Sequence, residues 1–121
     1  MSDELTVPPA APTLPLSTEV RKAYVDLYNS LETAIQGTTN VALLLALNPV
    51  QTQVSNVLTK DNMYKLHANT ALFQALLEQI EDTNEDLEKL QDQIASIAAG
   101  FDMAGKVLAA INKVLTLVPG L

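Results

Sequence analysis

The chain has 121 residues, a mass of 13.0 kDa and a net charge of −7, from seven basic and fourteen acidic residues. This length suits one domain with a single hydrophobic core. Apolar residues make up 48% and charged residues 17%, which excludes a disordered or fibrous chain. Aromatic residues make up only 4%, and Leu, Ala, Val and Ile supply most of the apolar mass. The composition therefore predicts an all-α fold.

Cysteine content and charge exclude several classes of function. Without Cys the chain has no disulfide framework, thiolate zinc site, iron–sulfur cluster or cysteine nucleophile. An acidic chain without a basic cluster is unsuited to phosphate binding, so we expect no nucleic-acid partner. Residues 1–10 lack the basic start of a secretory signal, and the longest apolar run, 41–47, is far shorter than the ~20 residues of a membrane span. We therefore expect neither a signal peptide nor a transmembrane span, with a cytoplasmic location as the default.

Residues 1–16 contain four of the six prolines and show no apolar periodicity. Such a segment buries too little apolar surface to offset the entropy cost of ordering, which predicts a disordered Pro-rich tail. Pro9, Pro12 and Pro15 are spaced three apart, as on one edge of a polyproline II helix. The tail is therefore a stiff leader or, alternatively, a docking motif.

The rest of the chain, 17–121, is predicted to be one helical domain of three helices. A first helix over 18–47 is expected to begin after Ser17 or Thr18, with Gly37 weakening its middle. Asn48-Pro49 favours a new helix over 49–98, with Asn48 as its cap and Pro49 at its first position. A kink or break near residue 60 is the alternative to one continuous helix. A third helix is expected over 102–118, before Pro119.

The helix over 49–98 carries the clearest repeat of the chain. Residues at the a and d positions of five heptads are apolar in eight of ten places, which is typical of a coiled-coil seam. The eight apolar seam residues are Leu66, Phe73, Leu76, Ile80, Leu87, Leu90, Ile94 and Ile97. The two polar ones, Asn69 and Thr83, either fix the register of the seam or face water at its ends.

An elongated antiparallel bundle follows from the helix lengths, with the first and third helices folded back along the second. The helix over 102–118 has a wide apolar arc that includes Leu108, Ile111 and Leu115. A rod of three helices leaves part of this arc, and of the run 41–47, uncovered. We therefore expect the chain to form homo-oligomers through the seam and these apolar surfaces.

An acidic face accompanies the seam. It consists of Glu78, Glu81, Asp82, Glu85, Asp86, Glu88 and Asp92, mostly at outward heptad positions. Like charges four residues apart destabilise a helix slightly. The face is therefore either a solubilising surface or a docking site for a basic protein partner.

The sequence offers no set of residues for catalysis, for a cofactor or for a metal ion. A single histidine, His67, excludes a three-histidine zinc site and a di-iron bundle built on two Glu-x-x-His motifs. Residues 100–106 match GxxxxGK, but Val107 stands where a phosphate-binding loop has Ser or Thr. The calcium-like spacing from Asp82 to Asp86 lies inside the heptads and lacks the required glycine.

We therefore expect a non-enzymatic helical-bundle protein that acts in protein–protein interaction or as a structural scaffold through self-association. The expected partners are a second copy and a helical or basic protein. The alternative is a membrane-active protein that uses the apolar helix 101–118 at a lipid surface. Burial of this helix in the bundle is the favoured interpretation, because its polar edge is narrow and only weakly basic. An enzyme with a site dispersed over the fold is a third reading.

Overall fold

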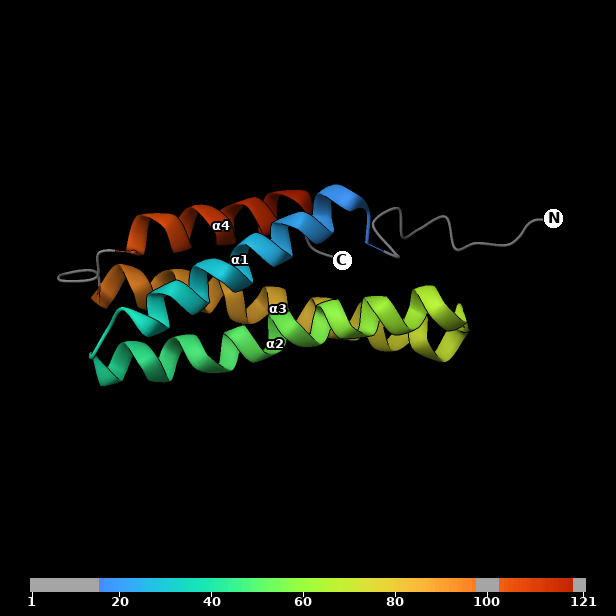
Figure 1. The fold of residues 1–121 in the computed structure, drawn as a ribbon, viewed down its shortest axis with the longest axis horizontal. Coiled ribbons are helices and arrows are strands. Elements are labelled where there is room, and N and C mark those ends of the chain that lie inside the picture. Colours follow the sequence, from blue (N-terminus) through green and yellow to red (C-terminus); the bar gives the residue numbers. More distant parts are fainter. Residues whose placement is uncertain (1–15, 98–102, 119–121) are drawn as a thin grey trace.

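The computed structural model describes residues 16–97 and 103–118, which form four α-helices (Figure 1). The helices are α1 (Thr18–Gln36), α2 (Val41–His67), α3 (Thr70–Ile97) and α4 (Ala104–Leu117). All regular secondary structure within these ranges is helical, which confirms the predicted fold class. The predicted tail, except for Leu16, and the junction between the second and third predicted helices at residues 98–102 lie outside the described residues.

Successive helices run in opposite directions and close into an up-and-down bundle (Figure 1). α1 packs against α2 and α4, and α3 packs against the same two helices, whereas the backbones of the diagonal pairs stay apart. The hairpin of α2 and α3 is the longest part of the rod, and its turn extends beyond the start of α1. Exposed positions recur from the first to the last turn of α2, so its outer side is accessible along its length.

The first helix ends at Gln36, so the structure differs from the prediction of one helix over 18–47. The Gly37 amide donates to the Thr33 carbonyl at 3.0 Å and closes α1. The Asn40 side chain then accepts from the Leu43 amide at 3.1 Å and caps α2. Gly37 thus ends one helix and Asn40, three residues later, starts the next. The apolar spacing alone does not reveal this break.

Pro49 lies inside α2, in contrast to its predicted position in the first turn of a new helix. The proline ring removes the amide that would have bonded to the Leu45 carbonyl. Both residues lie on the exposed side of α2, where solvent can satisfy that carbonyl. The Asn48 side chain donates to the Leu44 carbonyl at 3.1 Å, one residue away from the gap in the bonding pattern. The helix therefore continues through the proline.

The predicted helix over 49–98 is divided at Ala68 and Asn69, and α2 is continuous through residue 60. Ala68 adopts a left-handed conformation with φ of 48°, and its amide donates to the Tyr64 carbonyl at 2.6 Å. The Asn69 side chain accepts from the Leu72 amide at 2.9 Å, as a cap of α3 does. Asn69 is thus a capping residue at an exposed turn, and its predicted place in the seam is not observed.

Replacing Ala68 with Gly should raise the free energy of unfolding by about 0.5–1 kcal/mol. The left-handed conformation costs an L-residue about 1–2 kcal/mol because of its Cβ atom, and this exceeds the extra entropy that glycine loses on folding. Urea denaturation of the two proteins measures the difference. A less stable glycine variant would contradict the turn geometry, and Ala71→Gly, which has no such strain to relieve, is the matched destabilising control.

The core consists of one apolar stripe from each helix. Tyr24, Leu27 and Leu31 of α1 are fully buried and face the corresponding stripes of the other helices. On α3 the seam residues at intervals of three and four point inward. All four helices therefore share one continuous hydrophobic core, and their polar faces remain outside.

Candidate functional site

The predicted seam forms part of the bundle core. Six of its eight apolar residues are buried, namely Phe73, Leu76, Ile80, Leu87, Leu90 and Ile94. Leu66 is 79% exposed, because it precedes the turn at Ala68 and belongs to a different helix from the other seam residues. The side chain of Ile97 is outside the described residues. The buried part of the seam is used within one chain and is not free to contact a partner.

The apolar arc of α4 is also largely covered. Ile111 is buried, and Leu108 and Leu115 are half-buried against the core. The exposed side of α4 is small or polar and contains Gly105, Lys106, Ala109, Asn112, Lys113 and Thr116. In this bundle the surplus apolar surface expected on the last helix is therefore small.

Six residues of the acidic face are exposed, namely Glu78, Glu81, Asp82, Glu85, Glu88 and Asp92. Asp86 is half-buried, and its carboxylate accepts a hydrogen bond from Nε2 of Gln53 on α2. Thr83, the polar residue within the seam, is fully buried, and its hydroxyl accepts from Nε2 of Gln79 at 3.0 Å. Asp86 and Thr83 therefore have structural partners within the chain.

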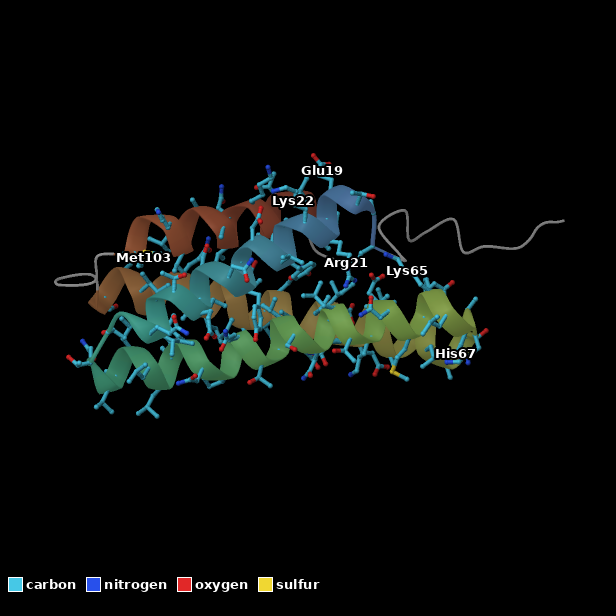
Figure 2. The ribbon with its side chains drawn as sticks, viewed as in Figure 1. Glu19, Arg21, Lys22, Lys65, His67 and Met103 are labelled. Carbon is cyan, nitrogen blue, oxygen red and sulfur yellow. The ribbon has the colours of Figure 1, made fainter. Side chains whose placement is uncertain are left out.

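Asp61 is a fully buried carboxylate that the sequence reasoning did not single out. Its Oδ1 accepts from the Leu16 amide at 2.9 Å, and its Oδ2 lies 2.7 Å from Arg21 and 2.9 Å from Lys65. Figure 2 shows Arg21 and Lys65 extending from α1 and α2 toward the same region, whereas His67 lies at the far end of the hairpin. One signal was present, since Asp61 is the only acidic residue between Glu32 and Glu78.

A second polar network joins three helices through Tyr24 and Asn84. The Tyr24 hydroxyl donates to Oδ1 of Asn84 at 3.0 Å, and Nδ2 of Asn84 donates to the Val118 carbonyl at 3.1 Å. Burial raises the pKa of the Tyr24 hydroxyl well above its ordinary value, although the hydrogen bond to Asn84 acts in the opposite direction. The folded state therefore favours the neutral hydroxyl.

Tyr24→Phe should cost about 1 kcal/mol of stability at neutral pH, because Asn84 loses its donor. The neutral hydroxyl contributes stability that is complete below the unfolded-state pKa of about 10 and is lost as the pH rises above it. The stability gap between wild type and Tyr24→Phe should therefore narrow in alkali. Urea denaturation at neutral and alkaline pH measures this gap, and an equal gap at both would contradict the assignment.

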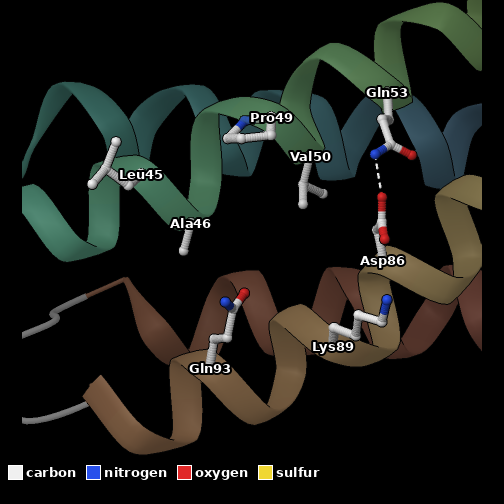
Figure 3. A pocket seen from close by; sticks show the side chains of 8 residues that line it. All are labelled: Leu45, Ala46, Pro49, Val50, Gln53, Asp86, Lys89 and Gln93. Carbon is white, nitrogen blue, oxygen red and sulfur yellow. Dashed lines mark hydrogen bonds between the residues drawn. The ribbon is translucent and has the colours of Figure 1, made fainter.

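A groove of about 230 Å³ lies between the first half of α2 and the second half of α3 (Figure 3). Its α2 side is mostly apolar, and its α3 side is polar. The lining residues are Leu45, Ala46, Pro49, Val50, Gln53, Asp86, Lys89 and Gln93. Oε1 of Gln53 is buried without a hydrogen-bond partner among the described residues. The groove therefore suits an apolar side chain that has a polar group beside it.

The outer stripe of α2 is the side of the helix opposite the core. It consists of eight exposed residues, Val41, Leu45, Asn48, Thr52, Asn56, Thr59, Met63 and Leu66. At 100° per residue these positions fall within an arc of about 80°. Among the described residues the exposed large hydrophobic side chains are Val41, Leu45, Met63 and Leu66, at 66%, 72%, 43% and 79% exposure. All four therefore lie on a single stripe of one helix.

The outer stripe carries no charge, although the chain as a whole is acidic. α2 has three charged residues, and each is turned away from the stripe. Asp61 is buried, Lys65 pairs with it, and Lys60 donates to Oε1 of Gln79 on α3 at 3.0 Å. The stripe is thus an uncharged surface beside the acidic face of α3.

Two further site classes can be judged on the described residues. Within 16–97 and 103–118 no group of three His, Cys, Asp or Glu side chains is placed to hold a metal ion. In the same ranges α2 alone is long and apolar enough to cross a membrane. Its length and composition alone do not indicate a membrane span, because core helices pass the same test and one side of α2 is in the core.

Comparison with known proteins assigns the chain to no family. No protein-family model, curated protein or solved structure matches it. The function must therefore be inferred from the fold and surfaces of this chain.

Proposed function

We propose that the chain is a non-enzymatic helical-bundle protein that acts in protein–protein interaction, or as a scaffold subunit, through self-association on the outer stripe of α2. The observation that carries this proposal is that the four exposed large hydrophobics of the described residues lie on that stripe, as one pair at each end of α2. Single exposed apolar residues are scattered on most protein surfaces, whereas neighbouring ones aligned on one uncharged stripe favour a binding surface. Only Leu66 is shared between this surface and the predicted seam, since the six seam residues from Phe73 to Ile94 are buried in the core.

The charge distribution is compatible with self-association on the outer stripe of α2. Two copies of a chain with net charge −7 repel each other, and the repulsion is strongest where acidic faces meet. The outer stripe is uncharged, so copies that meet there bury no like charges. A basic partner on the acidic face of α3 would instead form contacts that salt screens.

The lipid-binding alternative requires helix 101–118 to leave the bundle. The apolar side chains that would enter a lipid interface, such as Ile111 and Val114, are buried against the other helices. Their exposure would cost about 25 cal/mol for each Å² of apolar surface. We therefore favour association through α2, and dye leakage from liposomes with the folded chain tests the alternative.

The double substitution Leu45→Lys and Leu66→Lys should convert the associated chain to monomer without unfolding it. Both side chains are exposed, so the change leaves the core intact, but in the interface it buries unpaired charges. Sedimentation velocity measures the mass, and circular dichroism measures the helix content. Ala109→Lys, on the exposed side of α4, is the matched control and should leave association unchanged. Loss of association in the control alone would contradict the proposal.

A further inference from the structure

The outer stripe of α2 reads almost the same in both directions. From either end it has two apolar residues, then two neutral polar ones, up to a centre near residues 53 and 54. Val41 and Leu45 at one end correspond to Leu66 and Met63 at the other. Asn48 and Thr52 correspond in the same way to Thr59 and Asn56.

We propose that two copies associate through a two-fold symmetric, antiparallel pairing of their α2 helices along this stripe. In a two-fold interface, if residue i of one copy contacts residue j of the other, then j also contacts i. A surface that meets itself in antiparallel orientation must therefore match its own reverse. The outer stripe has this property over 41–66, a length of about 37 Å at 1.5 Å per residue.

The pairing places like with like along the whole stripe. Val41 of one copy lies opposite Leu66 of the other, and Leu45 lies opposite Met63. In the middle, Asn48 faces Thr59 and Thr52 faces Asn56, which brings amide and hydroxyl groups within reach of each other. A parallel pairing would also join like residues, but the helix dipoles of the two copies would point in the same direction, which is unfavourable. In the antiparallel pairing the two dipoles point in opposite directions, which is favourable.

The groove beside the stripe adds a place for side chains of the second copy. Leu45 belongs both to the stripe and to the groove lining, so the two surfaces are continuous. The end of the partner helix that reaches Leu45 carries Met63, a long adaptable apolar side chain.

The pairing predicts a simple order of distances between spin labels. Because the chain has no Cys, one introduced cysteine gives one label per copy. In an antiparallel pair the axial separation of equivalent labels grows by about 3 Å for each residue from the centre, twice the helical rise. Thr52→Cys and Asn56→Cys should give the shortest distances. Asn48→Cys and Thr59→Cys should give longer ones that are similar to each other.

This inference rests on the proposed function, and the measurement separates their failures. Equal distances at all four positions would mean a parallel pairing, and distances without this order would mean another interface. Either result overturns the antiparallel pairing and leaves self-association standing. A monomeric chain overturns both. Ala109→Cys on α4 is the control and should give a distance longer than that from Thr52→Cys.

Charge exchange provides a second readout that does not need labels. Leu45→Lys should weaken association at least about tenfold, since the charge has no partner. Adding Met63→Glu should restore it, because in the antiparallel pairing the new carboxylate lies opposite the new ammonium group. The matched control adds Val41→Glu instead, which pairs only within its own helix. Equal recovery in both double variants, or none in either, overturns the assigned pairing.

Discussion

Replacing Leu90 with Ala should lower the free energy of unfolding by about 2–5 kcal/mol, and Leu76→Ala should do the same. Both side chains are fully buried on the inner side of α3. Truncation removes their apolar burial and leaves a cavity that the surrounding helices fill only in part. For a domain of this size such a loss is a large share of the total stability.

Three controls show whether the effect depends on burial. Leu66→Ala lies on the same predicted heptads but is exposed, so its cost should be far smaller. Glu85→Gln and Glu88→Gln on the acidic face should change stability by less than about 0.5 kcal/mol, or improve it slightly by relieving repulsion. Thermal melts followed by circular dichroism compare all five variants. Early melting of the glutamine variants without a change in Leu76→Ala and Leu90→Ala would show that the assigned register is wrong.

Asp61→Ala should destabilise the bundle by about 3 kcal/mol. The change removes the buried acceptor that the Leu16 amide, Arg21 and Lys65 share, and it leaves the buried amide without a partner. Asp61→Asn should cost less, because its amide oxygen can still accept from the Leu16 amide. Urea denaturation at neutral pH measures both losses.

The matched control for this prediction is Asp26→Asn. The pair of Lys22 and Asp26 is of the same type, at 2.9 Å, but both side chains are mostly exposed. Exposed pairs of this kind contribute little to stability. If Asp61→Ala loses no more stability than Asp26→Asn, the contacts of Asp61 do not stabilise the packing of α1 on α2.

The elements that the sequence predicted well are those with strong repeats. Burial from Phe73 to Ile94 followed from a strict heptad, because a side chain that recurs every 3.5 residues must stay on one side of a helix. The last helix was also predicted closely, as 102–118 against the observed 104–117, since its apolar arc stops before Pro119. In both cases the local pattern agreed with the tertiary packing.

The turns were harder to predict, because several residues compete as helix ends. Asn48-Pro49 has the usual features of a helix start, yet Asn40 caps the helix and Pro49 is accommodated on its exposed side. The turn at Ala68 uses a left-handed alanine, where glycine is the usual residue. Which candidate ends a helix depends on how the following helix packs, and spacing alone does not contain that information.

The candidate site was the least predictable part. α2 is apolar on two sides, so its sequence does not distinguish the core side from the outer stripe. Leu66 fits the heptads of α3, and only the turn at Ala68 assigns it to the outer stripe of α2. Self-association was expected from an apolar surplus on the run 41–47, the last helix and the seam. The bundle largely covers the seam and the last helix, whereas Val41 and Leu45 of the run 41–47 are exposed on the outer stripe.

The molar mass of the wild-type chain, measured by light scattering over a series of concentrations and salt levels, tests the central claim most directly. We expect twice 13.0 kDa at high concentration and a fall toward 13.0 kDa on dilution. Added salt should maintain or strengthen the association, because it screens the repulsion between two acidic copies and finds no ion pairs to weaken on the outer stripe. A mass of 13.0 kDa at every concentration, or a dimer that dissociates as salt is added, would contradict association through the outer stripe of α2.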